Sequence, residues 1–93
     1  MSKAKGAYYE HRAIKLLETL GYRCFRSGAS LGEFDIIALG PREVKAIQVK
    51  GGIDPRLSPL EREAIELLQV SSQVSKELWK FYKHKREPII EVL

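Results

Sequence analysis

The chain has 93 residues, of which 44% are hydrophobic and 30% are charged. This length predicts one domain spanning residues 1–93, because neither half alone is long enough to bury a core, and the composition excludes wholesale disorder. Sixteen Lys and Arg against twelve Asp and Glu give a net charge of +4, which permits a nucleic-acid partner without establishing one.

No apolar run approaches the roughly 20 residues that span a bilayer, and the N-terminal stretch lacks the apolar core of a signal peptide. The single Cys24 can form neither an internal disulfide nor a cysteine metal site, which is typical of a reducing compartment. The lack of Asn and the many Lys, Arg and Glu residues resemble a thermophile's composition. We therefore expect a cytoplasmic protein.

The first expected element is a helix over residues 5–20, which Gly21 ends as a C-terminal glycine does. At 100° per residue, its broad apolar face holds Ala7, Ala13, Ile14, Leu16, Leu17 and Leu20. Glu10 projects within that apolar face. A carboxylate there is costly unless it is paired, so we expect a partner for Glu10 in the fold.

Residues 22–27 alternate in a way that predicts a strand, and residues 28–32 form a loop of small residues. Two apolar segments follow, joined by a turn at residues 40–43, and these predict a β-hairpin. If those four residues are the whole loop, Leu39 opposes Val44 and Asp35 opposes Gln48. The two-residue period of a strand then places Asp35, Gln48 and Lys50 on one side of the sheet.

The second expected helix covers residues 58–68, because Ser58, Pro59 and Glu61 form a capping box with proline in the first turn. We expect its apolar positions to be buried in part, namely Leu60, Ala64, Ile65, Leu67 and Leu68. Residues 70–75 are expected to be a connection. Residues 77–83 fit both a strand and a helix, and their dense aromatics favour a strand. Residues 88–93 are the final strand, which gives an α/β class with the order α-β-β-β-α-β-β.

The polar residues of the hairpin suit the cleavage of a phosphodiester bond, which needs a cation, an activated water and stabilisation of the developing charge. Asp35 is the best candidate for a direct Mg²⁺ ligand, and Gln48 offers an amide oxygen. Lys50 is expected to orient the attacking water or to neutralise charge on the phosphate. Glu10 supplies a second carboxylate if the first helix packs over this sheet face.

These residues resemble the PD-(D/E)XK nuclease superfamily, through Glu10 in a first helix, the element from Gly32 to Asp35, and the sequence Gln48-Val49-Lys50. Within it, residues 26–35 resemble the loop and strand of archaeal-type Holliday-junction resolvases. The resemblance covers residues 5–50 well, the helix after Ser58 loosely and the C-terminal third poorly.

The resemblance implies a restriction-endonuclease-like domain, with a central mixed β-sheet flanked by helices, in a prokaryotic or viral protein. It also implies a homodimer that uses Mg²⁺ or Mn²⁺ to cut branched DNA in recombination or repair. The implied catalytic residues are Glu10, Asp35, Gln48 and Lys50, and the implied metal ligands are Glu10, Asp35 and Gln48. Ser30 is implied as a residue of the site or of the DNA contact. The basic residues that we expect to bind DNA phosphates are Lys3, Lys5, Arg23, Arg26, Lys85 and Arg86.

The chain departs from the family pattern at two positions. Phe34 stands where the family has proline, and Gln48 stands where most members have Glu or Asp. An amide carries no charge and cannot act as a base, which predicts weaker metal binding. Three alternatives remain open: a viral replication-repair type nuclease of the same superfamily, a catalytically inactive DNA-binding module, and a structural subunit that exposes Trp79 and Phe81 to a partner.

Overall fold

The computed structural model describes the backbone of residues 2–26 and 33–93. The order of elements is α1 (Ser2–Thr19), β1 (Arg23–Arg26), β2 (Ile36–Leu39), β3 (Val44–Gly52), α2 (Pro59–Leu67), β4 (Val74–Tyr82) and β5 (Ile89–Val92). The expected order is therefore confirmed, and residues 77–82 of the segment expected as a strand belong to β4, which ends one residue before Lys83. That strand already begins at Val74, so the connection expected at residues 70–75 is shorter than predicted.

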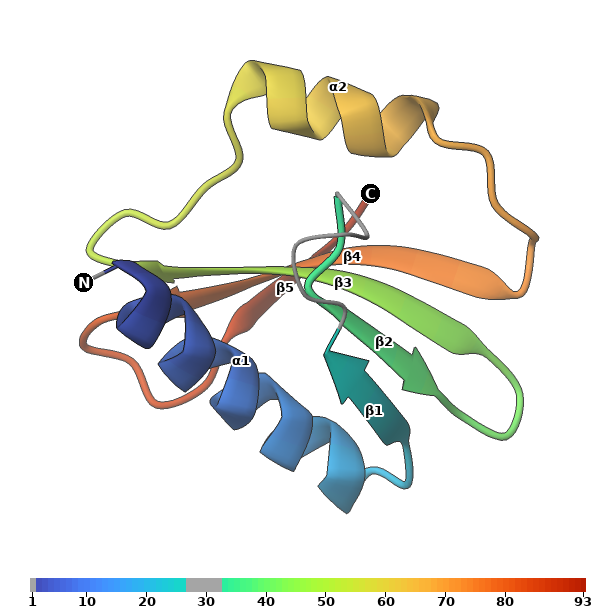
Figure 1. The fold of residues 1–93 in the computed structure, drawn as a ribbon, viewed down its shortest axis with the longest axis horizontal. Coiled ribbons are helices and arrows are strands. Elements are labelled where there is room, and N and C mark those ends of the chain that lie inside the picture. The colour runs from blue at the N-terminus through green and yellow to red at the C-terminus, as the bar shows by residue number, and fades with distance from the viewer. Residues whose placement is uncertain (1, 27–32) are drawn as a thin grey trace.

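The strands form one five-stranded sheet in the order β1-β2-β3-β4-β5. Strands β3 and β4 pair in parallel, because the crossover through α2 returns the chain to the end of the sheet at which β3 began. The other neighbouring strands of this sheet are antiparallel. Helix α1 lies on one face of this sheet and α2 on the other (Figure 1). The chain is thus a small α/β domain with a mixed sheet between two helices, compatible with a restriction-endonuclease-like fold.

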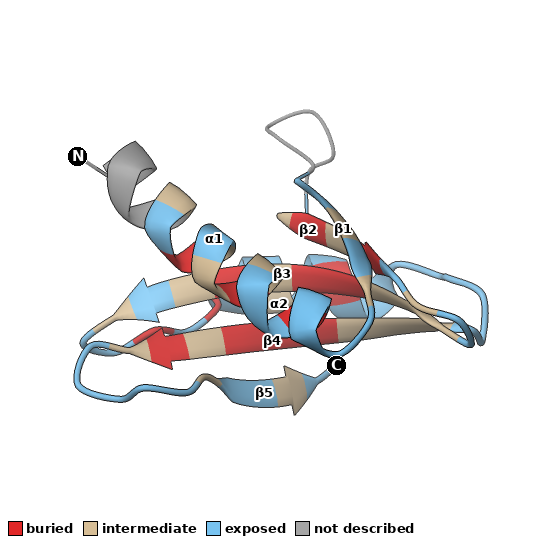
Figure 2. Ribbon diagram, turned by 90° about the horizontal axis from the view of Figure 1, so that it is seen from below, coloured by how far each residue is buried: buried red, intermediate tan, exposed pale blue. Residues whose placement is uncertain are grey.

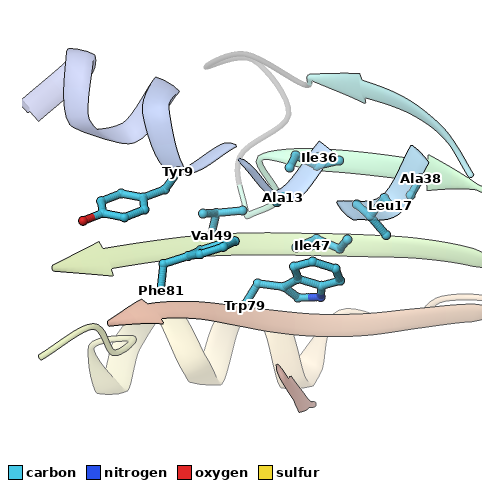
Figure 3. Close-up of a cluster of buried hydrophobic side chains, with 9 residues drawn as sticks. All are labelled: Tyr9, Ala13, Leu17, Ile36, Ala38, Ile47, Val49, Trp79 and Phe81. Atoms are coloured by element: carbon cyan, nitrogen blue, oxygen red, sulfur yellow. The ribbon is translucent and has the colours of Figure 1, made fainter. Parts of the chain in front are cut away.

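The alternation of strand side chains gives each face its own core. The core under α1 contains Tyr9, Ala13, Leu17, Ile36, Ala38, Ile47, Val49, Trp79 and Phe81, whose side chains interlock in Figure 3. The core under α2 is smaller and contains Phe34, Ala46, Leu57, Ile65 and Leu78. Trp79 and Phe81 are 2% and 0% exposed, so the hypothesis that they are presented to a partner is wrong.

Helix α1 ends as the sequence predicts. Gly21 has a φ of 92°, and the amides of Gly21 and Tyr22 donate to the carbonyls of Glu18 and Leu17. These two bonds form the Schellman arrangement that closes a helix on a left-handed residue. Tyr22 can therefore turn directly into β1, which begins one residue later.

Helix α2 begins with the expected capping box, formed by Ser58 and Glu61. At its other end, the ammonium of Lys76 on β4 donates to the carbonyls of Ile65, Glu66 and Leu68. These bonds satisfy carbonyls that a helix end leaves free. Both ends of α2 are thus held by side chains.

The expected burial of α2 is largely wrong. Ile65 is the buried residue of this helix, whereas Leu60, Leu67 and Leu68 are 79%, 72% and 40% exposed and Ala64 is also exposed. Figure 2 shows where burial is concentrated in the sheet: buried segments lie on β2, β3 and β4, whereas β5 is exposed or intermediate along its length. A short helix on one side of a sheet buries a narrow stripe, so most of its apolar residues face solvent. Neither helix in the described part of the chain is apolar over a length sufficient to cross a membrane.

Candidate functional site

The site lies where β3 extends beyond β2. Strand β2 pairs with β3 from Ile36, opposite Ile47, to Leu39, opposite Val44. Strand β3 then continues to Gly52 with β4 as its neighbour, so among the described strands its last residues are paired on one side. Asp35 immediately precedes β2 at this opening, and its amide donates to the carbonyl of Ile47 at 2.8 Å.

The hairpin that creates this opening has the expected register. Its turn is closed by the Gly40 amide donating to the carbonyl of Glu43 at 2.9 Å, and Leu39 pairs with Val44. Asp35 comes one residue before the first pair of the ladder, in which Ile36 opposes Ile47. The same register, continued by one residue, sets Asp35 opposite Gln48. The four-residue turn thus brings Asp35 to the last part of β3, as predicted.

Asp35 is the centre of the site. The Val49 amide donates to Asp35 Oδ2 at 2.8 Å. Burial raises the pKa of this carboxyl, and the Val49 hydrogen bond opposes that rise; the charges of Glu10 and Glu61 raise the pKa further, and that of Lys50 lowers it. Asp35 is therefore within electrostatic reach of one acid on α1, one acid on α2 and the lysine of β3.

Glu10 has the partner that its place on the apolar face requires. Its carboxylate accepts a 2.9 Å hydrogen bond from Arg26 Nε at the end of β1, and its side chain is 17% exposed. The sequence indicated Arg26 as a DNA contact, and the structure ties it to Glu10. One face of the 47% exposed Arg26 side chain remains open to solvent. The pair fixes Glu10 near the end of the sheet where Asp35 lies.

The packing of α1 also fixes Glu10, through its neighbour Tyr9. A Cβ added at Gly51 would lie 2.2 Å from the Tyr9 ring, so glycine is what allows this ring to lie on the β3 backbone. The same ring stacks on Phe81, with centroids 5.7 Å apart. Tyr9 was not among the expected core residues, although it is 8% exposed.

Gln48 and Lys50 both face α2, as two residues separated by one position in a strand should. Helix α1, which carries Glu10, packs on the opposite face, so the expectation that the first helix covers the face of Gln48 and Lys50 is wrong. Gln48 lines a cavity of about 300 Å³ with Glu33, Leu60, Glu61, Ala64 and Ile65. Its Oε1 atom is buried and lacks a hydrogen-bond partner among the described residues. Lys50 Nζ lies 3.0 Å from Glu61 Oε2. The residues that line the cavity between β3 and α2 therefore include Gln48, whose amide oxygen lacks a partner among the described residues, and two acids, Glu33 and Glu61.

Sequence reasoning missed Glu61 as a member of the site. The capping-box pattern already accounted for a glutamate at position 61. The sequence therefore held no signal that this carboxylate has a second contact. A hydrogen bond from the Ser58 amide lowers the pKa of Glu61, and Lys50 acts in the same direction. The carboxylate is thus held in its charged form beside Lys50.

The described basic residues that were expected to contact DNA lie on two separate segments, β1 and the loop before β5. Arg23 and Arg26 are both exposed, but they lie at opposite ends of β1. Lys85 and Arg86 are exposed in the loop before β5, and Arg12 on α1 donates to the carbonyl of Arg86. The side chains of Lys3, Lys5 and Ser30 lie outside those that the structure describes.

The donor set fits a hard divalent cation. Mg²⁺ takes oxygen ligands and needs only one or two carboxylates, since it keeps several waters. Asp35 and Glu10 are carboxylates, and the buried Oε1 of Gln48 accepts no hydrogen bond from the residues that the structure describes. Within residues 2–26 and 33–93, however, no three His, Cys, Asp or Glu side chains come together as a metal site. A cation here would rely on the amide.

The five-stranded mixed sheet and its two helices are compatible with the restriction-endonuclease-like class of domain. No family model matches the chain. It is 31% identical over 99 aligned residues to a UPF0102 protein from the bacterium Kosmotoga olearia, in an alignment covering 100% of this chain and 85% of that protein. The chain belongs to the UPF0102 family, which lies within the restriction-endonuclease-like, or PD-(D/E)XK, superfamily.

Proposed function

We propose that this chain is a metal-dependent endonuclease that hydrolyses phosphodiester bonds in DNA. The observation that carries the proposal is the convergence on Asp35, whose carboxyl responds to the charges of Glu10 and Lys50 while lying beside Gln48 in the hairpin. Two acids, an amide oxygen and a lysine at one end of a mixed sheet suit this chemistry. A fold alone would not need them there.

Glu10, Asp35 and Gln48 are the residues that would hold Mg²⁺ or Mn²⁺. When bound, the cation polarises the phosphate oxygens and favours ionisation of the attacking water. The hydrogen bond from the Val49 amide orients the Asp35 carboxylate, and Arg26 orients that of Glu10. The Lys50 ammonium offsets negative charge that develops on the phosphate, or orients the water that attacks it.

The finer part of the proposal is a preference for branched DNA, as in the Holliday-junction resolvases that the sequence resembles. A junction presents two strands to be cut, so this part includes a homodimer with two sites. The open edge of β5 supports self-association, because Ile89, Ile90 and Val92 are 46%, 47% and 69% exposed, and an unpaired apolar strand favours pairing with another strand. Sedimentation equilibrium measures the assembly directly, and a monomer at every concentration would remove the dimer from the proposal.

The test of the activity incubates purified protein with end-labelled four-way-junction, flap and linear duplex DNA, in Mg²⁺, Mn²⁺ or EDTA. We expect cleavage that requires the cation, that favours the junction, and that falls by about 100-fold or more, to a measurable residual rate, in Asp35→Ala and Lys50→Ala. A preference for flaps or linear ends would instead favour a viral replication-repair type of specificity. Cleavage at the wild-type rate in both variants would overturn the proposed site.

A catalytically inactive DNA-binding module is the second candidate, and one observation favours it. Gln48 is uncharged, and the described part of the chain lacks a trio of acids that would hold a metal. This candidate expects salt-sensitive binding of labelled DNA, with the affinity falling steeply between low and moderate salt. It also expects no cut product under any cation.

A further inference from the structure

We propose that Glu61 on α2 is a positioning residue for Lys50, and that it couples the start of this helix to the site. The proposal rests on the nuclease function proposed above, because it assigns Lys50 a role in cleavage. Lys50 Nζ and Glu61 Oε2 are 3.0 Å apart. Both side chains are partly exposed, at 29% and 44%, and an ordinary surface ion pair of this kind contributes little.

Three bonds distinguish Glu61 from an ordinary surface partner. Its Oε1 accepts from the Ser58 amide at 2.9 Å, its own amide donates to Ser58 Oγ at 3.1 Å, and Oε2 remains for Lys50. The carboxylate is therefore fixed by the capping box before it meets the lysine. Most of the entropy that a flexible glutamate loses in an ion pair is already lost in forming the cap.

The position of the pair relates it to the rest of the site. Glu61 and Gln48 line the same cavity, and the charges of both Glu61 and Lys50 reach Asp35. Without Glu61, the long side chain of Lys50 would sample many rotamers at this opening. With Glu61, the ammonium stays on the α2 side of the sheet, where Gln48 also points. A fixed ammonium near the reacting phosphate is what orientation in catalysis requires.

The test compares wild type with Glu61→Gln, because glutamine at this position can still form the capping box but loses the ion pair. Glu63→Gln is the matched control, since Glu63 is exposed on the same helix and its side chain makes no ion pair or hydrogen bond with the described residues. Single-turnover cleavage of a labelled four-way junction in Mg²⁺ is measured over a range of enzyme concentrations. Thermal unfolding followed by circular dichroism checks that each variant folds.

For Glu61→Gln we expect the maximal rate to fall roughly 10-fold while the half-saturating concentration changes less than about 3-fold, which separates orientation from DNA binding. Glu63→Gln should cleave as wild type does. In a Lys50→Ala background, Glu61→Gln should have no further effect, because Glu61 acts through Lys50.

Two results overturn the positioning role while the nuclease function stands: an unchanged rate in Glu61→Gln, or a full additional loss in the Lys50→Ala background. A wild type that cuts none of the substrates overturns the nuclease function itself, and the positioning role with it. The two failures are thus distinguished by the wild-type lane alone.

Discussion

The backbone amide of Val49 on β3 donates a 2.8 Å hydrogen bond to Oδ2 of Asp35, so a strand already paired with β4 also holds the central carboxylate of the site. An asparagine at this position can accept the same bond without a charge. Because burial is the main cause of the raised pKa of Asp35, its ionised form costs folding free energy, and Asp35→Asn relieves that cost.

For Asp35→Asn we therefore expect an unchanged or higher thermal unfolding midpoint in metal-free protein. Cleavage should fall by about 100-fold or more, since losing even an outer-shell partner of a metal site costs about 10–100-fold. Glu63→Gln, at an exposed glutamate of α2, is the control for a change of charge alone. Retained cleavage in Asp35→Asn would show that this carboxylate is not a ligand.

Gln48→Glu tests the role of the amide. A carboxylate placed where Oε1 is buried and unpartnered, beside Asp35, should lower the stability of the metal-free protein by about 1–3 kcal/mol. Mg²⁺ should restore more stability to this variant than to wild type, because a charged oxygen binds the cation more tightly.

Cleavage by Gln48→Glu should equal or exceed that of wild type. Urea unfolding with and without Mg²⁺ measures the stability of Gln48→Glu and the share of it that the cation restores. Gln73→Glu, at an exposed position, is the control. Loss of cleavage together with tighter Mg²⁺ binding would show that the neutral amide has a specific role.

Gly51→Ala should move α1, and with it Glu10, away from the site. The new methyl group would lie 2.2 Å from the Tyr9 ring, so the helix must move, at a cost of about 1–3 kcal/mol of stability. Cleavage should also fall, because Glu10 follows Tyr9 in the chain. A Tyr9→Leu background relieves the clash, and the two substitutions should be non-additive by more than about 0.5 kcal/mol in urea unfolding. Additive effects would mean that the ring adapts without moving the helix.

The pair between Arg62 on α2 and Glu91 on β5 should make stability depend on pH. Its two hydrogen bonds, of 2.8 and 3.2 Å, lower the pKa of Glu91 from its ordinary value of 4.5. A carboxyl with a lowered folded pKa contributes stability above its unfolded pKa and loses it as the pH falls through the folded value.

The difference in urea midpoint between wild type and Glu91→Gln should therefore be present at neutral pH and should vanish well below pH 4.5. Glu63→Gln, at an exposed residue of α2, should show no comparable difference at either pH. A Glu91→Gln difference that persists in acid would assign the effect to packing instead of to the charge.

Local signals in the sequence predicted much of this fold. The turn at residues 40–43 gave the register of the hairpin, Gly21 gave the end of α1, and Ser58 with Glu61 gave the start of α2. Each depends on residues a few positions apart, where turn and capping chemistry is specific. The place of Asp35 beside Gln48 followed from the same local register.

Contacts between distant elements were harder to predict. The helical periodicity of α2 did not reveal that Ile65 would be buried while Leu60 stays exposed, because that depends on how the helix lies on the sheet. The pattern likewise predicted a partner for Glu10 but not its identity as Arg26. Glu61 was missed because one local role already accounted for it.

The parallel pairing of β3 with β4 also has a consequence for the order in which the site assembles during folding. Each residue of β3 pairs with one thirty positions later in the chain, as Val44 does with Val74, whereas the hairpin that aligns Asp35 with Gln48 closes over four residues. Contacts of long sequence separation form slowly, since a large loop must close first. We therefore expect the hairpin to form early, and Lys50 to meet Glu61 only when the crossover closes. A chain released before β4 is synthesised would contain every proposed site residue from Glu10 to Glu61 but would lack the parallel partner of β3, and it should be inert towards DNA.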